Sequence, residues 1–365
     1  MRILHVSDDP LPDGRVLRAA RYMRELGHQV FFAGPLSPTL ETHPFEEVTT
    51  LPWTARARLR IPPYWGAMSR RLEGILHRLR PDILHAHNIC SAKLCMETSY
   101  PFIYDDHEYI SRELLALGEK LPANTGLKGH IAFRMSLFLW ARWEKEVVTN
   151  GPVVTVCNTT AQEHQSLGGR AYVIPNMPDK EDAVLLAGSP ANPPAEFSVA
   201  YSGVDRWDRQ VPFRSMEGFM DLFHRHDIGK LVVYGDQDLK TRVPVYSVGF
   251  LSRSELLRRI GENSVGVIPW LPHWFHRYCN PNKAYDYAHA GLPVVSPHDL
   301  TPVTESLGRF CFCFKDYDSL SKLLAGLRQS RDNIVKLRGE IRRFAASNLT
   351  FERYAPSLYR AYQDA

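Results

Sequence analysis

The chain has 365 residues, of which 44% are hydrophobic and 23% are charged, and its formal net charge is +4 at pH 7. This length exceeds one comfortable hydrophobic core, so we expect two domains of ordinary globular composition. The charge is too small to indicate a nucleic-acid-binding protein, and the chain has neither a basic tail nor a ribonucleoprotein motif.

The six cysteines are scattered, and no two of them form a Cys-x-x-Cys pair. This spacing argues against structural zinc and against a disulfide framework. The first ten residues turn acidic at Asp8, which does not fit a signal peptide. No stretch of about eighteen uncharged apolar residues predicts a membrane span. We therefore expect a cytoplasmic protein with reduced thiols.

The beginning of the chain predicts a βαβ unit made of a strand, an amphipathic helix and a second strand, at residues 3–6, 15–26 and 30–33. Ligands bind at the carboxyl ends of strands in open parallel sheets. The loop with Asp13, Gly14 and Arg15 is therefore a candidate binding loop. It has one glycine where a dinucleotide fingerprint needs three. The alternative is that Asp13 and Arg15 only start the helix.

Residues 53–80 carry seven arginines and one acidic residue, Glu73, with tryptophan and tyrosine side chains between them. This composition predicts either a solvated basic face or a surface for peripheral contact with the inner face of an anionic membrane. Residues 126–148 predict a helix with one strongly apolar side. We expect that side to pack in the core, and membrane contact is the alternative.

Two predicted buried strands end in histidines. Residues 81–87 end in His85 and His87, which point to the same side of the strand. A metal would suit them, but no third ligand is evident, so we expect structural histidines and no metal. Residues 102–108 form the next strand and end in His107 and Glu108, which by themselves indicate only a polar loop.

The small residues and prolines of 187–194 predict a linker. We therefore predict an N-terminal domain at residues 1–187, a linker at 188–195 and a C-terminal domain at 196–349. Strand and helix patterns alternate in both domains, which predicts a doubly wound α/β fold for each.

A short helix is predicted at residues 281–290. Asn280 is expected to cap it, Pro281 suits its first turn, and Gly291 is expected to end it in a left-handed conformation.

The polar residues Asn282, Lys283 and Asp286 gather near the first turns of this helix. A cation, a carboxylate and free backbone N–H groups suit a phosphate with a hydroxylated sugar beside it. The alternative is a capped surface helix with an internal ion pair.

Residues 281–295 have the pattern Pro-Asn-Lys-x-x-Asp-Tyr-x-x-x-Gly-x-Pro-Val-Val, which resembles the donor-binding signature of the group 1, family 4 glycosyltransferases. The order and spacing of weaker motifs extend the resemblance over nearly the whole chain. It implies the GT-B fold, in which two Rossmann-like domains face each other across a cleft. It also implies a C-terminal helix, at about residues 350–365, that crosses back onto the first domain.

The implied activity is that of a hexosyltransferase. Such an enzyme moves a sugar from a nucleotide-diphosphate sugar to a hydroxyl acceptor with retention of anomeric configuration, in glycan or cell-envelope biosynthesis. The resemblance implies that it uses no metal and no cofactor besides the nucleotide sugar.

On the donor side, the resemblance implies that Arg209 and Lys283 hold the diphosphate and that Asp286 holds the ribose hydroxyls, with Asn282 beside it. Gly249 is implied to lie next to the nucleobase. Gly14 belongs to a loop that approaches the donor phosphates.

On the sugar side, His107 is implied to face the transferred sugar, with Glu108 orienting its imidazole or contacting the acceptor. Asp13 and Arg15 are implied contacts of the acceptor or the sugar. The aromatic segment before the helix brings His276 and Tyr278, which either contact the sugar or pack against the rest of the protein.

Two positions depart from the family pattern. Tyr278 stands where the first of two glutamates is expected, and Val204 stands where an arginine is expected. These departures keep two alternatives open, a nucleotide-sugar epimerase of the GT-B fold and a sugar-nucleotide-binding protein without catalysis.

Overall fold

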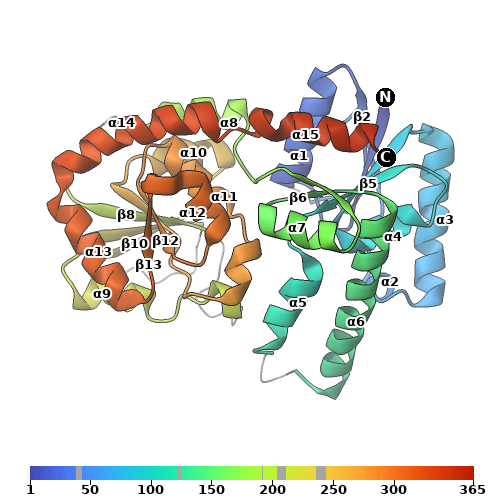
Figure 1. Ribbon diagram of the computed structural model, residues 1–365, viewed down its shortest axis with the longest axis horizontal. Helices are drawn as coiled ribbons and strands as arrows, with labels where there is room; N and C mark the ends of the chain where they lie inside the picture. Colours follow the sequence, from blue (N-terminus) through green and yellow to red (C-terminus); the bar gives the residue numbers. More distant parts are fainter. Residues whose placement is uncertain (38–42, 122–124, 191, 204–210, 236–243) are drawn as a thin grey trace. The chain divides into compact units, whose positions relative to one another are not determined.

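The computed structural model describes residues 1–37, 43–121, 125–190, 192–203, 211–235 and 244–365. The chain forms two compact units, each described by itself (Figure 1). Unit 1 contains Met1–Pro175 and Tyr354–Ala365, and unit 2 contains Asn176–Arg353.

Unit 1 is built on a parallel sheet that has seven strands among the described residues, in the order β3-β2-β1-β4-β5-β6-β7. Its strands are β1 (Arg2–Ser7), β2 (Gln29–Gly34), β3 (Glu47–Thr50), β4 (Ile83–His87), β5 (Phe102–Asp106), β6 (Pro152–Thr155) and β7 (Arg170–Val173). Its helices are α1 (Gly14–Glu25), α2 (Ala55–Arg58), α3 (Pro62–Leu79), α4 (Asn88–Met96), α5 (Ile110–Gly118), α6 (Leu127–Asn150), α7 (Asn158–Ser166) and most of α15 (Phe351–Gln363).

Unit 2 repeats this plan with a parallel sheet in the order β10-β9-β8-β11-β12-β13. Its strands are β8 (Ser198–Ser202), β9 (Lys230–Tyr234), β10 (Val245–Gly249), β11 (Val265–Val267), β12 (Val294–Pro297) and β13 (Cys311–Phe314). Its α-helices are α8 (Lys180–Ala187), α9 (Phe219–Arg225), α10 (Arg253–Ile260), α11 (Asn282–His289), α12 (Thr301–Leu307), α13 (Tyr317–Gln329) and α14 (Arg331–Asn348). Three 3-10 turns are also described, η1 (Pro212–Arg214), η2 (Trp274–Tyr278) and η3 (Gly308–Phe310).

The central strands of both sheets are buried almost throughout, as parallel strands covered on both faces should be. In unit 1 the core includes Leu72 and Leu76 of α3 and Trp143 of α6. The predicted doubly wound α/β fold is thus confirmed for each unit. In the described part of the chain, no helix is both long enough and apolar enough to cross a bilayer.

The division between the units differs from the predicted boundaries. The first break lies between Pro175 and Asn176, so α8 belongs to unit 2 although the predicted N-terminal domain ran to residue 187. Packing explains the difference, because Leu186 of α8 is buried and Asp182 pairs with Arg253 of α10. The prolines after α8 therefore connect two elements of unit 2.

Candidate active site

The strand order of unit 2 reverses next to β8, which lies between β9 and β11. In open parallel sheets, ligands bind at such a switch point, outside the carboxyl ends of the strands. The chain leaves β8 at Gly203 and leaves β11 toward Trp270. Lys283, in the first turn of α11, reaches this place.

Aromatic rings hold the ammonium group of Lys283. Its Nζ lies 4.5 Å from the centroid of the Tyr201 ring and 5.2 Å from that of Trp270. The same Nζ lies 3.4 Å from the Tyr201 hydroxyl oxygen. Cation–π contacts of this kind fix the position of the ammonium group at the positive end of α11.

Glycines let the backbone approach closely beneath this ammonium. A Cβ added at Gly203 would lie 2.8 Å from Lys283 Nζ, and one at Gly235 would lie 2.7 Å from the Gly203 carbonyl oxygen. Gly235 also has φ +104°, a left-handed conformation that favours glycine. The carboxyl ends of β8 and β9 are therefore open to Lys283 only because both residues lack a side chain.

The helix that carries Lys283 is shorter than predicted. It begins at Asn282 with Pro281 as its N-cap, and no side chain caps it. The side chain of Asn280, predicted to be the cap, instead accepts a hydrogen bond from Asn176 N at 3.0 Å and donates one to the Tyr285 hydroxyl at 2.8 Å. The first-turn N–H groups are thus left without a side-chain cap.

Asp286 is buried and paired with Arg253. Arg253 Nη1 lies 2.7 Å from Oδ2 and Nη2 lies 2.8 Å from Oδ1, a bidentate arrangement. Arg253 also donates to Asp182 Oδ2. Asp286 was predicted to face a ribose, and in this structure both of its carboxylate oxygens face the guanidinium. Arg253 was missed in the sequence, where its only signal is its position at the start of a helix just after the Gly249-Phe250 turn.

The other residues predicted to bind the donor, apart from Gly14 of unit 1, are Asn282, Gly249 and Arg209. Asn282 is exposed at the first residue of α11. Gly249 ends β10 with φ +76°, and the next residue, Phe250, has 58% of its surface exposed. An exposed ring at a strand end offers a face for base stacking. Arg209 lies outside the described residues.

The two predicted sugar contacts of the aromatic segment are buried. His276 Nδ1 lies 2.9 Å from Asp299 Oδ1, and its Nε2 lies 2.6 Å from the Phe213 carbonyl oxygen. Tyr278 has only 5% of its surface exposed. Of the two interpretations of this segment, packing therefore describes His276 and Tyr278, whereas Trp274 has 41% of its surface exposed.

The loop after β1 in unit 1 also lies at a switch point, because β1 lies between β2 and β4. Asp13 caps α1 by accepting hydrogen bonds from Arg15 N at 2.8 Å and Val16 N at 3.0 Å. Burial would raise the pKa of Asp13, but the His107 ring and the Val16 N–H outweigh burial and lower it. Asp13 and His107 are therefore close enough to interact electrostatically. Gly14 is the first residue of α1 and is exposed.

Arg15 points inward rather than to the surface. Its Nε lies 2.8 Å and its Nη2 2.7 Å from Asp105 Oδ1, and its Nη1 donates to the Ile174 carbonyl oxygen at 2.8 Å. The residue is 7% exposed. Its role here is to hold Asp105, a residue to which the sequence had assigned no function.

The other carboxylate oxygen of Asp105 faces three imidazoles. Oδ2 lies 3.3 Å from His85 Nε2, 3.4 Å from His87 Nδ1 and 3.6 Å from His107 Nε2. Burial would raise the pKa of Asp105, but Arg15 and His107 outweigh burial and hold the pKa well below its usual range. The carboxylate is therefore ionised.

His107 differs from the other imidazoles of this cluster in the direction of its pKa shift. Burial would lower its pKa, but Asp105 outweighs burial and raises it above the ordinary value. Burial lowers the pKa of His85, and it lowers that of His87 to about 3. The carboxylate that the structure places beside His107 is thus Asp105, whereas Glu108 is exposed.

His5 is the fourth histidine of this cluster, and the sequence analysis did not identify it. The parallel register pairs it with His85, and its Nδ1 lies 2.9 Å from His87 Nε2. His87 Nδ1 in turn lies 3.1 Å from His107 Nε2. Only the register of β1 and β4 brings these rings together.

Among the described residues, two groups of three bring ligand atoms within 4.8 Å of one another, His5 with His85 and His87, and His87 with Asp105 and His107. In the first group His87 stacks on both other rings, whereas His5 and His85 are tilted by 39°. His5 and His87 are also hydrogen-bonded directly to each other, so their ring nitrogens already form part of a buried hydrogen-bonded chain.

Residues 15–182 match the family model described as Glycosyltransferase Family 4. This part of the chain is similar to glycosyltransferase family 4. The match includes Arg15, His85, His87, His107 and α5 to α7. No curated protein matches the chain.

Solved structures extend the likeness to the whole chain. Sucrose-phosphate synthase from Thermosynechococcus elongatus has a TM-score of 0.68 at 14% identity, with 100% of this chain and 98% of that chain covered. HepE from Anabaena, in complex with UDP and glucose, has a TM-score of 0.67 at 13% identity, with 100% of both chains covered. A glycosyltransferase from Rickettsia africae has a TM-score of 0.63 at 14% identity, with 99% and 97% covered. These likenesses show that the chain has the GT-B fold.

Proposed function

We propose that the protein transfers a hexosyl group from a nucleotide-diphosphate sugar to a hydroxyl acceptor, with retention of anomeric configuration and without a metal. The observation that carries this proposal is the placement of Lys283. Its ammonium lies at the N-terminal turn of α11 and at the switch point of unit 2, against Tyr201 and above Gly203. A diphosphate is the ligand that such a place suits best.

The charge on Lys283 has a chemical use in this reaction. As the glycosidic bond to the donor breaks, negative charge grows on the leaving diphosphate. A fixed ammonium and the uncapped N–H groups of α11 would stabilise that charge, which is the task that a metal performs in other enzymes. Arg209 is proposed as a second cation on the diphosphate.

Unit 1 would supply His107 to the sugar. Asp105 raises the pKa of this imidazole and Arg15 fixes Asp105, so the ring is held in place and its protonated form is favoured. A protonated imidazole is a donor to sugar hydroxyl oxygens. We propose that the leaving phosphate takes the proton of the acceptor hydroxyl, so that His107 positions the sugar and does not act as a base. Asp13 and Glu108 would contact the acceptor.

The structural neighbours suggest which donors to try first. HepE from Anabaena was solved with UDP, with UDP and glucose, and with UDP-glucose. We therefore propose a uridine nucleotide as the donor, with the exposed ring of Phe250 beside Gly249 as the stacking face for the base.

A panel of nucleotide sugars tests the proposal. The purified protein is incubated with UDP-, GDP- and ADP-hexoses, with and without simple hydroxyl acceptors, and products are analysed by mass spectrometry. Release of a nucleoside diphosphate from one donor, at the same rate with and without a chelator, supports the proposed transferase. An isomerised donor indicates the epimerase, and tight binding without turnover indicates a binding protein; either result removes the proposal.

Location and membrane contact remain part of the proposal. All six cysteines are free thiols, which fits the reducing cytoplasm. Within the basic segment 53–80, Arg60 pairs with Glu97 and Arg78 pairs with Glu47, which reduces its charge toward solvent. Arg70 and Arg71 are exposed on α3 and would carry peripheral contact through this segment.

A further inference from the structure

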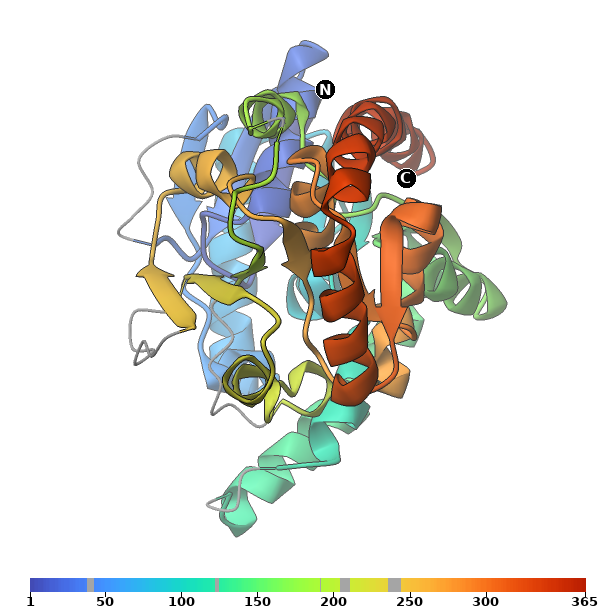
Figure 2. The ribbon, with the colours of Figure 1, turned by 90° about the vertical axis from the view of Figure 1, so that its left-hand side faces the viewer.

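Helices α5 and α6 form a hairpin that extends beyond the sheet of unit 1, as Figures 1 and 2 both show. Only the C-terminal half of α6 is anchored in the core, through Trp143, Val147 and Val148. Trp140 adds a hydrogen bond from its Nε1 to the Arg58 carbonyl oxygen at 3.1 Å. The N-terminal half of this 24-residue helix therefore stands away from the packed core.

An apolar stripe follows the outer part of α6. Exposed fractions of these side chains are 77% for Leu127, 51% for Ile131, 46% for Met135 and 68% for Phe138. Their spacing of four, four and three residues places them on one face of the helix. Of the fourteen large apolar side chains that are exposed among the described residues, five lie on this hairpin, including Leu115 of α5. Such clustering marks an interaction surface.

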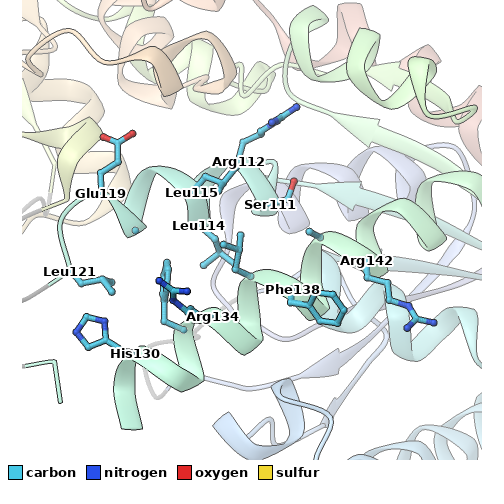
Figure 3. A pocket seen from close by; sticks show the side chains of 14 residues that line it. Ser111, Arg112, Leu114, Leu115, Glu119, Leu121, His130, Arg134, Phe138 and Arg142 are labelled. Atoms are coloured by element: carbon cyan, nitrogen blue, oxygen red, sulfur yellow. The ribbon is translucent and has the colours of Figure 1, made fainter. Parts of the chain in front are cut away.

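A groove runs between the two helices (Figure 3). Its volume is about 1260 Å³, and its apolar lining includes Leu114 of α5 and Phe133 and Leu137 of α6. Arg134 and Arg142 also line it. The hairpin thus combines an apolar groove, an apolar outer stripe and cations.

The charge of the hairpin has one sign over a long stretch. Between Glu119 and Glu144 the sequence has no acidic residue and has four cations, Lys120, Lys128, Arg134 and Arg142. The acidic residues of the hairpin, Glu113 and Glu119, lie on α5 and at its end, so the stripe-bearing part of α6 is purely cationic. In a symmetric contact between two such parts of α6, cations would meet the same cations. The complementary partner is a negatively charged surface with an apolar layer below it.

We propose that the α5–α6 hairpin docks on the surface of an anionic phospholipid bilayer. The stripe formed by Leu127, Ile131, Met135 and Phe138 enters the interface, and Lys128 and Arg134 contact the headgroups. The inference does not depend on the proposed transfer reaction, because binding to vesicles involves neither donor nor acceptor.

Vesicle co-sedimentation with the full chain tests the proposal. The vesicles contain phosphatidylcholine alone or with about a third phosphatidylglycerol. Wild-type protein is expected to pellet with the anionic vesicles. A Leu127→Ser, Phe138→Ser variant is expected to bind about tenfold more weakly, since the apolar contribution is lost. A Lys128→Gln, Arg134→Gln variant is expected to lose the preference for anionic vesicles.

Matched controls separate this surface from general effects. Val184→Ser removes an equally exposed apolar side chain, 72% exposed on α8, and is expected to bind like wild type. Lys322→Gln, Lys336→Gln removes two exposed cations from α13 and α14 and is expected to retain most of the binding. Thermal unfolding is measured for every variant to show that its fold is retained.

Three results would overturn the proposal. One is wild-type protein that stays in the supernatant with anionic vesicles. Another is a Leu127→Ser, Phe138→Ser variant that binds anionic vesicles as wild type does. The last is a wild-type dimer in sedimentation velocity that the stripe variant turns into monomer, because the surface would then be a contact between copies.

Discussion

At the scale of single residues, the position of the Lys283 ammonium depends on the absence of a side chain at Gly203. An alanine Cβ at Gly203 would lie 2.8 Å from Lys283 Nζ and 2.8 Å from the Tyr201 hydroxyl oxygen. Those distances are below van der Waals contact, so the ammonium would have to move. The backbone of β8 itself needs no change, because the conflict involves side-chain ends.

We therefore expect Gly203→Ala to lower kcat/KM for the nucleotide sugar by about 100-fold, the effect of losing one fixed charge-stabilising donor. The melting temperature is expected to change little. Gly326→Ala on α13 is the matched control, since a Cβ there meets nothing within 4 Å. Steady-state kinetics of both variants checks this prediction, and equal kcat/KM values would contradict it.

Asp286 is expected to matter for stability as well as for the donor. Its two oxygens bind Arg253, and it is 2% exposed. Asp286→Ala removes two charge-assisted hydrogen bonds and is expected to lower the free energy of unfolding by about 2 kcal/mol. Urea denaturation measures this change. An Asp286→Ala variant as stable as wild type would show that the pair with Arg253 contributes nothing to the fold.

At the scale of elements, three adjacent strands assemble the polar cluster of unit 1. The register pairs His5 of β1 with His85 of β4, and His87 of β4 with Asp105 of β5. The rings therefore share one face of the sheet, where burial keeps His5, His85 and His87 neutral. Neutral imidazoles in the folded state make stability depend on pH.

The sign of this dependence follows from the lowered pKa values. In the unfolded chain a histidine takes up a proton below its ordinary pKa of 6.5, whereas folded His87 does so only near its pKa of about 3. Its contribution to stability is present above pH 6.5 and is lost as the pH falls toward 3. Between pH 7 and pH 5, this one residue accounts for a loss of about 2 kcal/mol.

His87→Gln is therefore expected to make the decrease in unfolding free energy between pH 7 and pH 5 smaller by about 2 kcal/mol. Denaturant titrations at the two pH values measure it. His224→Gln, on α9 of unit 2, is the control and is expected to keep the wild-type difference between the two pH values. An unchanged difference in the His87→Gln variant would mean that His87 is already protonated in the folded protein.

Sequence patterns predicted the elements better than the contacts between them. The alternation of apolar strands and amphipathic helices was sufficient for the fold, and the short motif at 281–295 located Lys283. The ring contact of His5 with His87 spans 82 positions and depends on strand register. The Arg253–Asp286 pair depends on how α10 packs beside α11. Neither kind of information is contained in a local pattern.

At the scale of the whole molecule, composition alone assigned α8 to the N-terminal domain, whereas the structure places it in unit 2. Prolines and small residues after this helix resemble a linker, yet Asp182 on α8 pairs with Arg253. The same guanidinium holds Asp286, so α8, α10 and α11 share one ion-pair network in unit 2. The proposed donor-binding helix is thus supported by an element that the sequence had placed in the other domain.

The central claim is that Lys283 at the start of α11 holds the diphosphate of the donor. Isothermal titration calorimetry with UDP tests it most directly, using wild type, Lys283→Met and the control Lys336→Met on α14. We predict that wild type and Lys336→Met bind UDP alike and that Lys283→Met binds at least about tenfold more weakly with its melting temperature unchanged, as expected for the loss of a charge-assisted contact. Equal UDP affinity in wild type and Lys283→Met would contradict the account.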